Sequence, residues 1–283
     1  MEIKKVGVIG CGLMGGGIVQ TAAQAGYDVK VSEANDALLE KGLGSIKSIL
    51  SRNVEKSRMS REEMDAILSR IQGTTRLSDF SDRDLVIEAV TENMELKKKL
   101  FADLDKICPP STIIATNTSC LSIIDMAMMT RRADKVLGIH FFNPVPLMKL
   151  VEVVKTIATS DETLATGIKF GEKMGKKVVI AQDSPGFIVN RLVVPFILNA
   201  IRMFDNGAAA KEDIDAAINL GLNHPMGPLT LADLIGLDTV LFIANAMYSE
   251  LKDPQFAAPS LLNKMVTAGW LGRKTSKGFY EYK

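Results

Sequence analysis

Short apolar runs alternate with amphipathic segments over the first two thirds of the chain. The first run covers residues 4–9 and is followed by a glycine-rich turn, which is typical of a buried parallel strand. Residues 13–25 then carry apolar positions at helical spacing, and residues 28–32 form a second apolar run. Two charged amphipathic segments follow, and they predict a pair of helices over residues 36–52 and 60–70.

Five further apolar runs predict additional strands. They cover residues 85–90, 112–116, 135–140, 150–154 and 177–180. Helical patterns lie between most of these runs, for example over residues 95–107 and 162–174. This alternation predicts a doubly wound, mostly parallel α/β sheet, into which the charged helix pair is inserted as a hairpin.

The pattern changes after residue 180. Pro185 and Gly186 mark a break, and only helical periodicity follows them. Candidate helices cover residues 187–205, 211–220, 228–235, 238–250 and 259–268. We therefore expect two domains, residues 1–184 with the sheet and residues 185–283 as an all-helical C-terminal domain.

The turn after the first predicted strand matches the pattern G-x-G-x-x-G, with glycines at Gly10, Gly12 and Gly15. The first glycine permits a tight turn, the second lets a pyrophosphate approach the backbone, and the third lets helix and strand pack closely. Leu13 and Met14 open the following helix, whose first N–H groups favour phosphates. Because the motif lies between a strand and a helix, it predicts a Rossmann-type dinucleotide site; a purely structural turn is the alternative.

Glu33 stands at the end of the second predicted strand, about twenty residues after the glycines. An acid here accepts hydrogen bonds from the adenosine ribose and repels a 2′-phosphate. Its neighbours Ser32 and Asn35 are not basic, which also favours NAD(H) over NADP(H). The alternative is a solvated acid at a strand end.

Three polar side chains follow predicted strands and are expected at the edge of the sheet where open α/β folds bind ligands: Ser119, His140 and Asn143. His140 suits proton transfer near neutral pH, as hydride removal from an alcohol carbon requires. Glu152 lies inside an apolar run, where a carboxylate needs a partner, so we expect it to pair with His140. A solvent-facing acid on an edge strand is the alternative for Glu152, and we assign His224 to a turn.

Composition narrows the function classes. The 283 residues are 47% hydrophobic and 24% charged, with a formal net charge of +1, so no large uniform field favours nucleic acid or a membrane. Three cysteines and two histidines provide neither a disulfide framework nor a zinc pattern, so no metal is expected. No signal peptide precedes the first strand, and the longest apolar-rich segment, residues 187–201, contains polar interruptions. We therefore expect a cytoplasmic protein.

Six ordered motifs together resemble the 3-hydroxyacyl-CoA dehydrogenase family, over essentially the whole chain. They are residues 10–15, 117–119, 140–144, 149–153, 185–191 and 272–280. The length is similar to that of the short bacterial members, the 3-hydroxybutyryl-CoA dehydrogenases. The resemblance implies reversible hydride transfer between NAD(H) and (S)-3-hydroxybutyryl-CoA or acetoacetyl-CoA.

The family's residue roles are implied at the matching positions of this chain. His140 is then the general acid or base, Glu152 pairs with it, and Ser119 binds the 3-oxygen of the substrate. Asn190, at the head of the helical domain, reaches the substrate from the other side. The implied cofactor contacts outside the glycine turn and Glu33 are Glu92, Lys97, Ser119 and Asn143.

The resemblance also implies a homodimer through the helical domain and a CoA moiety along residues 46–60. A basic cluster there, Arg52, Lys56, Arg58 and Arg61, could meet the CoA phosphates, with Arg52 and Lys56 as the chosen contacts; a solvated helical face is the alternative.

The chain departs from the family pattern at three positions. It has Glu33 where the family commonly has aspartate, Cys120 where it commonly has serine, and Ser276 where it commonly has glycine. Two other functions stay open from the sequence. One is a dehydrogenase of free 3-hydroxy acids, and the other is a non-catalytic cofactor-binding protein of the same fold.

Overall fold

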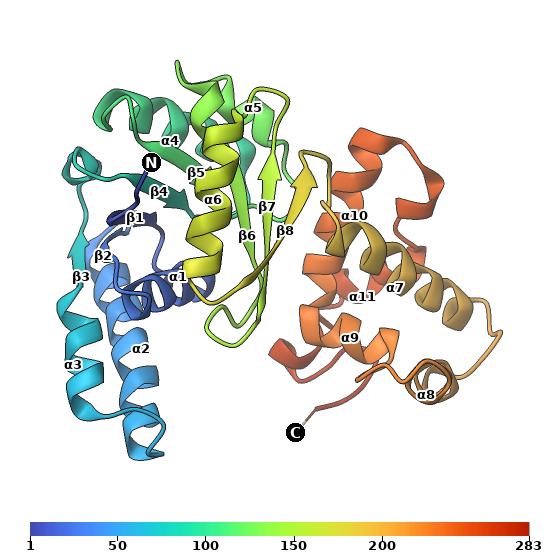
Figure 1. The fold of residues 1–283 in the computed structure, drawn as a ribbon. Helices are drawn as coiled ribbons and strands as arrows, with labels where there is room; N and C mark the ends of the chain where they lie inside the picture. Colours follow the sequence, from blue (N-terminus) through green and yellow to red (C-terminus); the bar gives the residue numbers. More distant parts are fainter. Residues whose placement is uncertain (283) are drawn as a thin grey trace. The chain divides into compact units, whose positions relative to one another are not determined.

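The computed structural model describes residues 1–282, which form two compact units. The first is Met1–Asp183, and the second begins at Ser184, one residue before the start of the predicted C-terminal domain. The first unit is a sheet covered by helices, and the second is built from helices (Figure 1).

The sheet of the first unit has eight strands in the order β3-β2-β1-β4-β5-β6-β7-β8. All neighbouring strands are parallel except β6 and β7, which are antiparallel. The order reverses between β1 and β4, which is the point where open α/β sheets bind ligands. The strands are β1 Lys5–Ile9, β2 Asp28–Ser32, β3 Ile71–Thr74, β4 Leu85–Glu88, β5 Ile113–Thr116, β6 Val136–Phe141, β7 Leu150–Lys155 and β8 Lys177–Gln182.

Helices cover both faces of this sheet. A Cβ on Gly167 of α6 would touch Leu137 of β6, whereas the next strand residue, Gly138, faces Ile123 of α5. Successive strand residues point to opposite faces, so α6 and α5 lie on opposite sides. The helices are α1 Leu13–Gln24, α2 Asp36–Glu55, α3 Arg61–Ser69, α4 Met94–Ile107, α5 Ile123–Ala127 and α6 Asp161–Lys173, with short 3₁₀ turns η1 Leu77–Phe80 and η2 Ala133–Lys135.

The structure confirms the predicted fold class, a mostly parallel sheet with a helical domain after it. The helices α2 and α3 form the predicted hairpin, and α3 begins with a capping box between Ser60 and Glu63. The sequence pattern did not predict β3 or α5. Each has only four or five residues, and β3 is half-exposed with a glycine in it, so neither shows a clear period.

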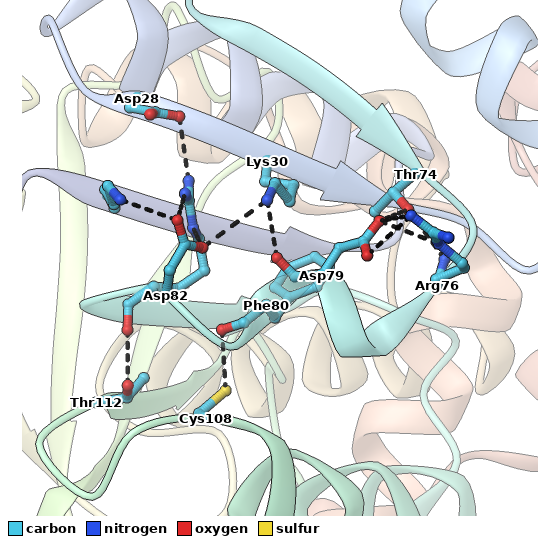
Figure 2. Close-up of polar contacts among 11 residues, drawn as sticks. Asp28, Lys30, Thr74, Arg76, Asp79, Phe80, Asp82, Cys108 and Thr112 are labelled. Atoms are coloured by element: carbon cyan, nitrogen blue, oxygen red, sulfur yellow. Dashed lines mark hydrogen bonds and ion pairs between the residues drawn. The ribbon is translucent and has the colours of Figure 1, made fainter.

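Charged residues bind the strands together at their amino ends (Figure 2). The buried Arg83 guanidinium donates two 2.8 Å hydrogen bonds to Asp82 and one of 3.1 Å to Asp28. The main-chain carbonyl of Arg83 accepts from the Thr112 hydroxyl at 2.6 Å. This guanidinium holds the pKa of the Asp82 carboxyl well below its usual range. The network therefore fixes the ends of β2, β4 and β5 at the edge opposite the glycine turn.

The second unit is helical, with its C-terminal tail held by two buried aspartates. Asp233 accepts from the Phe279 and Tyr280 amides and from the Tyr282 hydroxyl, each at 2.9 Å, and Asp215 accepts from the Tyr280 hydroxyl at 3.1 Å. The elements are α7 Val189–Asp205, α8 Lys211–Gly221, α9 Pro228–Ile235, α10 Leu237–Leu251 and α11 Ser260–Thr267, with η3 Pro254–Phe256 and η4 Arg273–Thr275.

At two positions of the tail, the structure shows which residue types the backbone allows. A Cβ at Gly278 would clash with the Asp233 carboxylate, so this site needs glycine. Ser276 has a φ of +58°, the left-handed region that glycine adopts most easily, so the turn forms even without the family's usual glycine.

Within residues 1–282, no single helix is both long and apolar enough to cross a membrane; α9 and α10 reach that length and composition only as a pair bent by 96°.

We expect Asp233→Ala to destabilise the helical unit, because it leaves three inward-facing donors without their shared acceptor. The free energy of unfolding should fall by about 3 kcal/mol. Urea denaturation followed by circular dichroism measures this change. The matched control is Asp205→Ala, an exposed acid at the end of α7, and a loss as large in that variant would contradict the assignment.

Candidate active site

The glycine turn between β1 and α1 has the shape that a dinucleotide requires. Gly10 has a φ of +96°, and a Cβ there would lie 2.6 Å from the carbonyl oxygen of Ala89. A Cβ on Gly15 would clash with the Gly10 carbonyl, so this glycine permits α1 to pack against the turn. Gly12, by contrast, has no atom within 4 Å of its Cβ position. Of the three motif glycines, Gly12 is therefore the one with open space beside its backbone.

The first turn of α1 can bind a negatively charged ligand. Gly12 is its N-cap residue, no side chain caps the helix, and the first turn holds no acidic residue. The predicted contacts Leu13 and Met14 open the helix, and Leu13 is 75% exposed. Since no side chain caps the first turn of α1 and no acidic residue lies in it, its N–H groups and the positive helix end fit the phosphates of NAD(H).

Glu33 lies just after β2 and binds the glycine turn itself. Its Oε1 accepts from the Cys11 amide at 2.6 Å, and its Oε2 accepts from the Ala34 amide at 3.2 Å. The sequence predicted a position near the nucleotide, but not this bond, which ties the acid to the turn across 22 residues. A contact with the ribose stays a prediction.

His140 and Glu152 lie directly opposite each other on the antiparallel strands β6 and β7. The Nδ1 of His140 is 2.6 Å from Oε2 of Glu152. Glu152 is fully buried and His140 is 6% exposed, so Glu152 is not the solvent-facing acid that the sequence left open. The ring of Phe142 also lies against His140, with centroids 4.6 Å apart. The bond to the carboxylate fixes the ring and balances charge when the imidazole is protonated.

An ion-pair network around the buried Lys97 holds the segment that carries Ser119. Oε1 of Glu92 accepts from the Ser119 amide at 2.9 Å and from the Thr118 hydroxyl. Lys97 Nζ lies 3.0 Å from Oε2 of Glu92 and 2.6 Å from Oε1 of Glu88. Through these bonds α4 fixes the backbone of Ser119 at the carboxyl end of β5.

Lys97 is only 1% exposed, and its ammonium lies between the Glu88 and Glu92 carboxylates. A direct cofactor contact stays a prediction for Lys97 and Glu92. Sequence reasoning missed Glu88, the last residue of β4, which also accepts from Thr116 at 2.7 Å. The sequence could have indicated Glu88, because an acidic residue at the end of a buried apolar run needs a cationic partner.

The segment between β6 and β7 carries Asn143, which is exposed. Asn117, at the end of β5, accepts from the Phe141 amide at 3.0 Å and so joins the two strand ends. Ser119 thus lies after the carboxyl end of β5, His140 is the penultimate residue of β6, and Asn143 lies just after β6. Their roles toward a substrate stay predictions.

The remaining predicted residues lie elsewhere. Asn190 is the second residue of α7 in the helical unit, so its approach to a substrate stays a prediction. The basic cluster is exposed at the tip of the α2–α3 hairpin, where Arg61 pairs with Asp65 at 3.6 Å. His224 lies outside the helices, as expected, with its ring 6.1 Å from that of Phe196. In the part of the chain that the structure describes, no group of three or more His, Cys, Asp or Glu residues could hold a metal.

The fold and the strand-end residues define a Rossmann-type dinucleotide-binding protein with a buried His–Glu pair. Residues 5–184 match the family model for the NAD-binding domain of 3-hydroxyacyl-CoA dehydrogenase, and residues 186–282 match that for its C-terminal domain. The chain therefore belongs to the 3-hydroxyacyl-CoA dehydrogenase family. It is an NAD-dependent oxidoreductase, and its cofactor is NAD(H).

Individual relatives cover the whole chain. A probable 3-hydroxybutyryl-CoA dehydrogenase of Bacillus subtilis is 48% identical, over 100% of this chain and 98% of its own. The 3-hydroxybutyryl-CoA dehydrogenase of Clostridioides difficile is 48% identical, over 98% and 99%. The crystal structure of (S)-3-hydroxybutyryl-CoA dehydrogenase from Ralstonia eutropha superimposes with a TM-score of 0.96 at 43% identity and covers 100% of both chains.

We expect the three cysteines to be unreactive in the folded protein. Burial raises the pKa of Cys11 to about 11, with help from Glu33, and also raises that of Cys108 to about 11 and of Cys120 to about 12. At pH 8 few thiolates are therefore present. Ellman's reagent should react on the order of a hundredfold more slowly with native than with urea-unfolded protein. Rapid titration of a native thiol would contradict this.

Proposed function

We propose that this enzyme interconverts (S)-3-hydroxybutyryl-CoA and acetoacetyl-CoA, with His140 as the general acid and base. The observation that carries the proposal is the buried His140–Glu152 pair, in which Nδ1 lies 2.6 Å from Oε2. His140 lies near the carboxyl end of β6, at the same edge of the sheet as the glycine turn after β1. The names of the full-length relatives from Bacillus subtilis and Clostridioides difficile support the choice of substrate.

Oxidation of the alcohol requires removal of a hydride from C3 and of a proton from the hydroxyl. When bound, NAD(H) accepts or donates the hydride. His140 takes the hydroxyl proton, and in the reverse direction it returns a proton to the ketone oxygen. Because Nδ1 bonds Glu152, we assign this proton transfer to Nε2. Glu152 keeps the ring oriented and stabilises the imidazolium that forms.

The Ser119 hydroxyl donates to the 3-oxygen of the substrate in this proposal, and Asn190 of the helical unit also reaches the substrate. The Glu92 carboxylate supports this role for Ser119, since its bond to the Ser119 amide fixes the segment. We further propose that Arg52 and Lys56 meet the CoA phosphates and that Asn143 contacts the cofactor. A homodimer through the C-terminal helices and a cytoplasmic location belong to the same proposal.

A spectrophotometric assay of NADH oxidation tests the substrate class. We expect acetoacetyl-CoA to be reduced with a kcat/KM at least a hundredfold above that for acetoacetate, because the CoA moiety supplies binding energy at the basic cluster. Parallel runs with NADPH should give much lower rates, since the Glu33 carboxylate repels a 2′-phosphate. Equal rates with acetoacetate would instead identify a dehydrogenase of free 3-hydroxy acids.

His140→Ala tests the mechanism. Loss of the proton-transfer group should lower kcat for acetoacetyl-CoA reduction by about a hundredfold or more, with little change in NADH binding. The control is His224→Ala, which removes the other histidine of the chain from a loop of the helical unit. A kcat in His140→Ala that stays near the wild-type value would exclude this role.

A further inference from the structure

One buried lysine has no part in the proposed chemistry. Lys176 lies between the end of α6 and the start of β8, and it is 8% exposed. Within residues 1–282, none of the ion pairs to a carboxylate involves Lys176. Its Nζ instead donates to two main-chain carbonyls, Val145 O at 2.6 Å and Met148 O at 2.8 Å. Burial lowers the pKa of this ammonium, which reflects the cost of keeping the charge there.

Both carbonyls belong to the loop of residues 142–149, which joins the two strands of the His–Glu pair. The loop begins with Phe142, whose ring lies 4.6 Å from that of His140, and with the exposed Asn143. The Leu147 and Met148 amides both donate to the Pro144 carbonyl at 3.0 Å, so the chain turns here. Lys176 binds two carbonyls of this turn from the segment between α6 and β8.

The same loop also packs against the dinucleotide helix. Val145 is 2% exposed, and a Cβ at Gly17 of α1 would lie 2.8 Å from the Val145 Cβ. The loop is thus held between α1 and Lys176, and Asn143 lies two residues from the carbonyl that Lys176 binds. A shift of the loop would change where Asn143 is presented relative to α1.

We propose that Lys176 is a positioning residue for cofactor binding: its buried ammonium holds the 142–149 loop so that Asn143 is presented beside the dinucleotide helix. The proposal rests on the cofactor contact proposed above for Asn143, and not on the identity of the acyl-CoA substrate. A purely structural lysine would affect stability and leave the affinity for NADH unchanged.

A double-mutant cycle on NADH affinity tests the proposal, with Kd measured by NADH fluorescence titration. Lys176→Met and Asn143→Ala should each raise the Kd on the order of tenfold. The Kd of the double variant should stay within about twofold of the higher of the two single-variant Kd values, because both changes remove the same contact. Fold-changes that multiply, or an unchanged Kd in either single variant, would overturn the proposal.

The control is Lys177→Met, which removes the neighbouring charge from an exposed side chain at the start of β8 and should leave the Kd unchanged. If Lys176→Met does not fold, Lys176→Gln takes its place in the cycle, because its amide still donates to one carbonyl. Titration of NADH requires no turnover. Wild-type protein that binds NADH without reducing acetoacetyl-CoA would therefore refute the proposed function alone.

Discussion

The bond between His140 and Glu152 depends on the one antiparallel strand pair in an otherwise parallel sheet. In the antiparallel register these two residues lie directly opposite each other, with side chains on the same face. A slip of one residue would send one of them to the other face of the sheet. The register is fixed by the apolar residues on both sides of each, so the core of the sheet sets the geometry of the pair.

Buried and partly buried charged groups organise the rest of this sheet edge. Glu88 and Glu92 share the Lys97 ammonium, and through Glu92 the pair reaches the backbone of Ser119. A buried ion is costly without a partner, so α4, which supplies Lys97, must pack where it meets both acids. The buried Lys176 meets the same requirement by binding a loop, and the partly buried Glu33 binds the glycine turn. Each of these charged groups thus connects elements that are distant in the sequence.

The two edges of the sheet use charge differently. At the amino ends, Arg83 joins Asp28 and Asp82 beside Thr112, and these bonds fasten strands to one another. At the carboxyl ends, the charged groups hold the loops and strand ends that carry the polar side chains of the proposed site. The division follows from the parallel sheet, because its carboxyl ends meet at one edge and open into a crevice at the switch point.

The local sequence determined much of this protein. Periodicity was enough for the long helices, the central strands and the change to an all-helical unit, because burial of one face imposes a fixed spacing. The glycine turn could also be predicted from the sequence, since Gly10 and Gly15 occupy positions where a Cβ would clash. Short elements such as β3 and α5 were not predicted, because four or five residues carry no clear period.

The pairings between distant residues were decided only by the tertiary structure. The sequence offered His140 and Glu152 as candidates, yet a solvent-facing Glu152 stayed open until the antiparallel register brought the two together. The bonds of Glu88 with Lys97 and of Lys176 with the 142–149 loop follow no local pattern. Periodicity reports which face of an element is buried, whereas a hydrogen bond depends on which two elements the fold makes neighbours.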